Sequence, residues 1–134
     1  MAYDSPDRLQ YLFKAIDFGA STSTQTIQVP VSGAQGRAGR VVGVILSDVS
    51  EDFAGSTTDA GVQVGDGTDA DKYFDSGLVL DETVDINDNA TLYLTDDGAQ
   101  VDIELGRSTV TVTFVAAAGT PTGIADVSVV IDWF

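Results

Sequence analysis

The stretch that decides the fold is residues 41–74, which read VVGVILSDVSEDFAGSTTDAGVQVGDGTDADKYF. Residues 41–46 are an apolar run rich in β-branched side chains, which predicts a short buried strand. Polar and small residues follow and predict a long loop, after which residues 61–64 predict an edge or half-buried strand. Gly65-Asp66-Gly67 ends this strand in a tight acidic turn, and Lys72-Tyr73-Phe74 leaves the turn. The order is therefore strand, loop, strand and turn.

The residues before this stretch predict further strands. Residues 11–18 carry large side chains on both alternating faces, which predicts a strand covered on both sides; a helix over residues 8–16 is the alternative. Residues 21–30 are rich in β-branched side chains and predict a strand that ends at Pro30, near a sheet edge. Residues 33–40 hold three glycines and two arginines and predict a loop, either a hairpin connection or a contact loop. This loop lacks the Gly-Lys-Ser/Thr pattern of a nucleotide site.

The residues after the stretch alternate in the same way. Residues 77–80 predict a short strand, and residues 81–89 a polar connection. Residues 91–94 and 99–105 predict a hairpin around Asp97-Gly98. The inward-facing residues of its second strand would be Val101, Ile103 and Leu105. Residues 109–115 show the clearest period-two pattern, and residues 116–123 turn the chain into the last strand. The inward face of that last strand would carry Val127, Val129, Ile131 and Trp133.

Together these patterns predict an all-β protein of about eight to ten short strands. The architecture would be an antiparallel β-sandwich or a jelly-roll-like barrel. Its 134 residues suit one domain. We expect residues 1–9 to form an extended N-terminal arm, because Pro6 and its neighbouring aspartates disfavour a strand there, and residues 10–134 to form the single domain.

Composition excludes several classes of function. The chain has no histidine and no cysteine, so it lacks the commonest general base and any thiolate ligand. Its net charge of −15 comes from 21 acidic and 6 basic residues and repels nucleic acid and anionic membranes. The charge is uneven: residues 1–47 hold three acids and four bases, residues 48–104 sixteen acids and one base, and residues 105–134 two acids and one base. The first third is the better docking surface.

Three side-chain constellations suggest other sites and are weak. Residues 85–96 imitate a calcium loop, but Ala90 stands where that loop needs glycine. Asp66, Asp69 and Asp71 could gather a hard cation, or they could cap their own backbone at a solvated hairpin tip. Paired carboxylates in loop tips lack the apolar surroundings of a general acid. We therefore expect no enzyme activity, no catalytic residues, no metal ligands and no cofactor.

One segment resembles a known group of proteins. Residues 62–74, VQVGDGTDADKYF, are similar to a Gly-(Asp/Asn)-x-Thr-Asp-Ala-Asp-x-Tyr/Phe segment of small virion proteins from tailed bacteriophages, especially marine ones. The strand at residues 41–46 and the terminal strand at residues 127–134 resemble that group as well. The resemblance covers residues 40–134 in layout and is specific over about a dozen residues. It implies a head decoration (cement) protein or minor structural protein with a β-sandwich fold and no catalytic residues.

On this resemblance we expect a capsid decoration protein. It would bind the major capsid protein on the outer surface of the phage head and stabilise contacts between its subunits. We expect a homo-oligomer, with a trimer over capsomer junctions as one arrangement. From the charge distribution we expect Tyr3, Arg8, Arg37 and Arg40 to contact the coat protein, with the acidic tip facing solvent. Residues 1–7 lack the apolar core of a signal peptide, so synthesis in the host bacterial cytoplasm is expected.

Two other functions stay open. A carbohydrate- or receptor-binding module of a phage tail or fibre would use exposed aromatics such as Tyr73, and a calcium ion could assist it. An alternative reading has Tyr73-Phe74 and Trp133-Phe134 closing the two ends of a sandwich core. A tail-tube or connector component would need longer hairpins than the sequence predicts.

Overall fold

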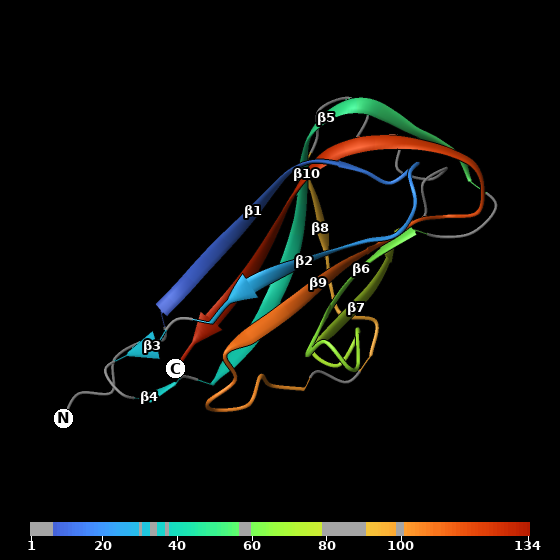
Figure 1. Ribbon diagram of the computed structural model, residues 1–134. Coiled ribbons are helices and arrows are strands. Elements are labelled where there is room, and N and C mark those ends of the chain that lie inside the picture. Colours follow the sequence, from blue (N-terminus) through green and yellow to red (C-terminus); the bar gives the residue numbers. More distant parts are fainter. Residues whose placement is uncertain are drawn as a thin grey trace.

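The computed structural model describes residues 7–29, 31–32, 35–36, 38–56, 60–78, 91–98 and 101–134. Two four-stranded antiparallel sheets make up the structure (Figure 1). The strands are β1 (Asp7–Asp17), β2 (Ser23–Gln28), β3 (Val31–Ser32), β4 (Gln35–Gly36), β5 (Gly39–Ser56), β6 (Ala60–Gly65), β7 (Phe74–Leu78), β8 (Leu92–Leu94), β9 (Thr109–Val115) and β10 (Gly119–Trp133). The predicted all-β fold is confirmed.

The strand order is that of a jelly roll. Sheet 1 has the order β1-β10-β5-β8, and sheet 2 has the order β2-β9-β6-β7. The strands pair from the outside of the sequence inwards: β1 with β10, β2 with β9, β5 with β8, and β6 with β7. Such nested pairing, divided between two sheets, is the double-sheet jelly-roll arrangement. The short strands β3 and β4 form a separate ribbon between β2 and β5.

The innermost pair is the β6–β7 hairpin, which lies in the stretch that organises the sequence. Its turn begins at Gly65, where an added Cβ would lie 2.0 Å from the carbonyl oxygen of Asp69, so only glycine fits. The Asp66 N–H donates to the Asp69 carbonyl at 3.1 Å, and the Tyr73 N–H donates to the Val64 carbonyl at 2.9 Å. The predicted tight acidic turn is therefore present, and it is the centre of the roll.

The core lies between the two sheets and follows the period-two pattern of β10. Val127, Val129, Ile131 and Trp133 are all fully buried, as predicted. An aromatic cluster closes the core near the end of β1: Phe114 lies 5.6 Å from Phe13 and 6.2 Å from Phe18, centroid to centroid. The Trp133 indole N–H donates to the Tyr11 hydroxyl at 2.8 Å, which joins β10 to β1 within the core.

Strand β5 corrects the expected loop after residue 46. It runs for 18 residues to Ser56 and pairs with β10 over most of its length. The pairing tolerates polar residues because the register shifts at several points, and Asp48 adopts a φ of 50°. Phe53 returns to the core with 3% exposure. The polar composition of residues 47–56 indicated a loop. The strand was missed because its partner, β10, lies about seventy residues further along the chain.

Three other strands differ from their predicted surroundings. Strand β6 lies between β9 and β7 and is buried along its length, so it is not an edge strand. Strand β1 is a strand and not a helix, but it is an edge strand with Leu12 53% exposed, so it is not covered on both sides. Strand β10 begins at Gly119, within the predicted turn. Strand β2 lies at a sheet edge, as expected.

The hairpin predicted around Asp97-Gly98 is wrong. Strand β8 pairs with β5, and the segment after it makes an isolated bridge between Ile103 and Gly39. Ile103 is buried, but Val101 and Leu105 are 46% and 69% exposed. The bridge gives this segment two backbone hydrogen bonds to the start of β5, at 2.7 and 3.1 Å, and side-chain contacts described below hold the residues after it.

Several expectations fall outside the described residues. These are the arm at residues 1–6, the end of the strand at residues 79–80, the polar connection at residues 81–89 and the first half of the calcium-loop imitation at residues 85–96. Residues 7–9, expected in the arm, form the start of β1. Within the described residues, no helix is long and apolar enough to cross a membrane.

Candidate functional site

Two of the four expected docking residues lie together on the outer face of sheet 1. Arg8 in β1 and Arg40 in β5 both stand opposite Asp132 of the intervening strand β10. Asp132 accepts hydrogen bonds from Nε and Nη2 of Arg8 at 2.7 and 3.0 Å. Arg40 makes the same two-point contact with Asp102, at 2.9 and 3.2 Å. Tyr3 and Arg37 lie outside the described residues.

These ion pairs keep the two aspartates ionised. Hydrogen bonding to Arg8 lowers the pKa of Asp132, and hydrogen bonding to Arg40 lowers the pKa of Asp102. Lys14 completes the pattern further along β1, with its Nζ 3.6 Å from Asp126. Among the described residues, the three bases of this face are thus matched by three acids, and the pairs add no net charge. In a protein with a net charge of −15, this part of the surface is electrically balanced.

An apolar groove of about 420 Å³ crosses the same face. It is lined by residues of β10, β5 and β8, and Arg8 lies at its β1 end. Val42 and Tyr93 are 44% and 69% exposed, whereas Val130 is nearly buried. The apolar lining residues are Val42, Val44, Ile45, Tyr93, Leu94 and Val130. Sequence analysis missed this groove because its residues come from four strands that are distant in the chain.

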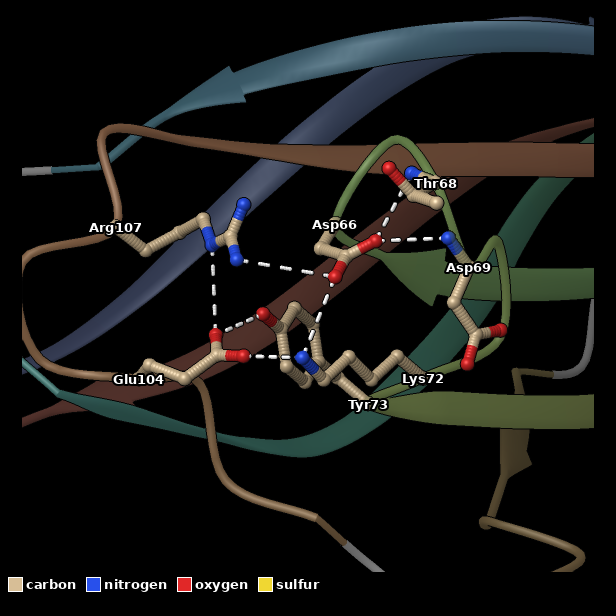
Figure 2. A network of polar contacts seen from close by, with 7 residues as sticks. All are labelled: Asp66, Thr68, Asp69, Lys72, Tyr73, Glu104 and Arg107. Carbon is tan, nitrogen blue, oxygen red and sulfur yellow. Dashed lines mark hydrogen bonds and ion pairs between the residues drawn. The ribbon is translucent and has the colours of Figure 1, made fainter.

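A second cluster of polar residues fixes the β6–β7 turn (Figure 2). Glu104 accepts hydrogen bonds from the Tyr73 hydroxyl and from Lys72 Nζ, and its carboxylate also pairs with Arg107 at 3.4 Å. Asp66 lies on the other side of the same cations, 3.3 Å from Lys72 and 3.7 Å from Arg107. The cluster ties Glu104, which directly follows the bridge between Ile103 and Gly39, to the centre of the roll.

The protonation states of this cluster are stable near neutral pH. The bond from Lys72, followed by that from Tyr73, lowers the pKa of Glu104 to about 2. Burial, followed by the hydrogen bond to Glu104, raises the pKa of Tyr73 to about 12. A general acid or base needs a pKa near the working pH, and neither group has one. The arrangement therefore suits a structural clamp rather than proton transfer.

The same geometry decides the cation hypothesis for Asp66, Asp69 and Asp71. Asp66 Oδ1 accepts the backbone N–H groups of Thr68 and Asp69 at 2.9 and 2.8 Å, and Oδ2 faces Lys72 and Arg107. Backbone capping by Asp66 is thus confirmed, and both of its carboxylate oxygens have partners within the protein. Among the described residues, no group of three or more acidic side chains is arranged to hold a metal ion.

The acidic turn is less exposed to solvent than expected, and the aromatic residues proposed for glycan binding are buried. The Asp66 side chain is only 12% exposed, because the two cations cover it. Tyr73 and Trp133 are fully buried, so neither ring can stack on a sugar. Burial of these rings agrees with the alternative reading, in which they close the core. The exposed aromatic residues in the described part of the chain are Tyr93 and Phe134.

Comparison with known proteins gives a distant similarity. No family model matches the chain, and no curated protein matches it. One solved structure, described as the capsid asymmetric unit of cyanophage Pam1, is similar with 16% sequence identity and a TM-score of 0.49, over 100% of this chain and 89% of that chain. At this identity and TM-score the similarity supports no functional argument.

Proposed function

We propose that this protein is a virion structural protein that decorates the outer surface of a phage head. The observation that carries the proposal is the balanced, partly apolar outer face of sheet 1 in a protein of net charge −15. Exposed apolar side chains bordered by polar ones mark interaction surfaces. The absence of histidine and the stable protonation states of the Glu104 cluster support a structural rather than a catalytic role.

Two further observations support the same proposal. Residues 62–74, which resemble phage virion proteins, form the central hairpin of the roll. Jelly-roll sandwiches are frequent in viral capsid domains, although a fold alone does not fix a function. On the head, the protein would contact the major capsid protein through Arg8, Arg40 and the apolar groove on the outer face of sheet 1. Bound to neighbouring subunits, as a monomer or an oligomer, it would add contacts that must break before the shell opens.

Reconstitution on phage heads that lack the protein tests this proposal. Added protein should saturate the outer surface of the heads and raise the temperature at which they release DNA. Val42→Asp places a charge in the groove and should abolish binding, because an unpaired carboxylate would be buried. Thr68→Asp places the same charge on the exposed turn and should bind like the wild type. Wild-type protein that leaves the heads bare, or coats them without changing their heat stability, would contradict the proposal.

A glycan-binding module of a tail or fibre is the second candidate. Jelly rolls also occur in lectin domains, and Tyr93 is exposed beside the groove, where a sugar ring could stack on it. On this alternative, a glycan array should give binding that Tyr93→Ala removes, and the protein should not coat heads.

A further inference from the structure

The two ends of the groove on sheet 1 differ in charge. Arg8 lies at the β1 end, and Thr95 lies at the β8 end. The next two residues, Asp96 and Asp97, line a neighbouring hollow of about 410 Å³. Its other acidic lining residues are Asp69, Asp71 and Asp75. An apolar floor therefore runs from a guanidinium at one end towards a group of carboxylates at the other.

Arg8 is held in a way that leaves it able to bind a second acceptor. Asp132 occupies the Nε and Nη2 side of the guanidinium. The N–H groups on the Nη1 side point away from this contact, because a guanidinium presents its donors in a fixed planar fork. The Arg8 side chain is 62% exposed, whereas the Asp132 side chain is 15% exposed. The carboxylate thus positions Arg8, and the exposed edge remains available to a carboxylate of a partner.

The acidic end of the groove favours a basic side chain of a partner. Asp97 accepts a hydrogen bond from the Gly77 N–H at 2.9 Å, and Asp96 accepts one from the Gly98 N–H at 3.0 Å. The side-chain hydrogen bond that Asp69 donates to Asp71 when protonated raises the pKa of Asp69, as expected where two carboxylates crowd each other. A cation placed here would relieve this repulsion, and Lys72 is the one basic side chain among the residues that line the hollow.

From these features we infer that the groove binds an extended segment of a partner protein with an acidic residue, a large apolar residue and a basic residue in that spatial order. The inference rests on the proposed docking role of this face. The acidic side chain would contact Arg8, the apolar one would lie on Val42, Ile45 and Tyr93, and the basic one would reach Asp96. Four strands spaced about 4.8 Å apart span about 14 Å, which an extended chain covers in about four residues. A second copy of the chain is disfavoured as occupant, because two molecules of net charge −15 repel each other.

Selection from a random twelve-residue peptide library tests the inference without phage heads. Peptides retained by the wild-type protein should share an acidic and a basic residue about four positions apart, with a large apolar residue between them. Arg8→Gln should weaken the best peptide about tenfold, and Val42→Asp should abolish its binding. Lys14→Gln, on the same face but outside the groove, should leave the affinity unchanged, and unfolding curves should show that all variants fold.

Other results would overturn the inference. These are peptides that share only lysine and arginine, peptides that bind Val42→Asp as tightly as the wild type, and a selection that enriches nothing. An oligomer in solution that Val42→Asp converts to a monomer would assign the groove to a second copy instead. Heads that bind the Arg8→Gln variant as tightly as the wild type would leave the decoration role intact. They would remove this account of how the groove contacts its partner.

Discussion

At the scale of single residues, Glu104 shows how an irregular segment is held in place. Its carboxylate accepts hydrogen bonds from Lys72 and the buried Tyr73 hydroxyl, both next to the β6–β7 turn, and pairs with Arg107 in its own segment. Sequence patterns could identify Asp66 as a backbone cap, because aspartate before a glycine turn commonly takes that role. They could not identify Glu104, because Lys72 and Tyr73 lie 32 and 31 residues away in the chain.

This cluster predicts a pH dependence. The pKa of Glu104 is about 2 in the folded protein against an ordinary 4.5, and that of Asp66 is about 2 against 3.8. A depressed folded-state pKa stabilises the protein above the unfolded-state value, and the stabilisation is lost as pH falls towards the folded-state value. We therefore expect the urea midpoint of the wild type to fall between about pH 4.5 and about pH 2.

Two variants isolate the contribution of Glu104. Glu104→Gln should be less stable than the wild type at neutral pH and should show a flatter profile across the acidic range. Asp52→Asn removes an exposed carboxylate elsewhere and should keep the wild-type profile. Urea titrations followed by tryptophan fluorescence would report both, since Trp133 lies in the core. Parallel profiles for the wild type and Glu104→Gln would contradict this account.

At the scale of strands, β1 contains an irregularity that β10 supports. The register between the two strands shifts between Phe13 and Ile16, and Ala15 takes a φ of 52°. Asp126, which is 6% exposed, accepts the Ala15 N–H at 2.9 Å and faces Lys14. A bulge of this kind twists an edge strand and discourages pairing with another molecule.

The bulge predicts different effects for two aspartates that pair with basic side chains, Asp126 in β10 and Asp102 in the segment after β8. Asp126→Ala leaves the Ala15 N–H and the neighbouring lysine without their partner and should lower the free energy of unfolding by about 1–3 kcal/mol. Asp102→Ala breaks an exposed ion pair and should cost less than about 1 kcal/mol. Equal losses in chemical denaturation would show that Asp126 does not support the bulge.

The same scale shows what the sequence could predict. Strands with period-two alternation on a buried face, such as residues 109–115 and the end of β10, were predicted correctly because their pattern is local. The hairpin at Asp97-Gly98 was wrong, because β8 pairs with β5 and the following segment is held by a single bridge to Gly39 and by side chains. The loop after residue 46 was wrong for a related reason: pairing with β10 outweighs the polar composition of the strand.

At the scale of the whole molecule, the excess of carboxylates opposes folding. With 21 acidic and 6 basic residues, repulsion between like charges outweighs the ion pairs that salt would weaken. Raising sodium chloride from about 0.01 M to about 0.15 M shortens the screening length from about 30 Å to about 8 Å. We expect the thermal midpoint to rise by about 4 °C, equivalent to about 1 kcal/mol.

Calorimetry at the two salt concentrations would measure this shift. Sodium chloride and sodium fluoride should give the same midpoint if screening is the cause, because specific anion binding would separate them. A midpoint that falls with salt would show that the ion pairs of the surface dominate over the general repulsion. The overall charge was readable from composition alone, whereas the balanced patch on sheet 1 depends on three-dimensional pairing.

The nested order of the strands has a consequence for synthesis on the ribosome. β10 lies between β1 and β5 and pairs with both. Sheet 1 therefore lacks its second-longest strand until residue 133 has left the exit tunnel. Until then β1 and β5 expose apolar faces to the crowded cell, and contacts so distant in sequence also make the final step slow. A premature stop codon even a few positions before Trp133 would therefore yield an aggregating product rather than a shortened working one.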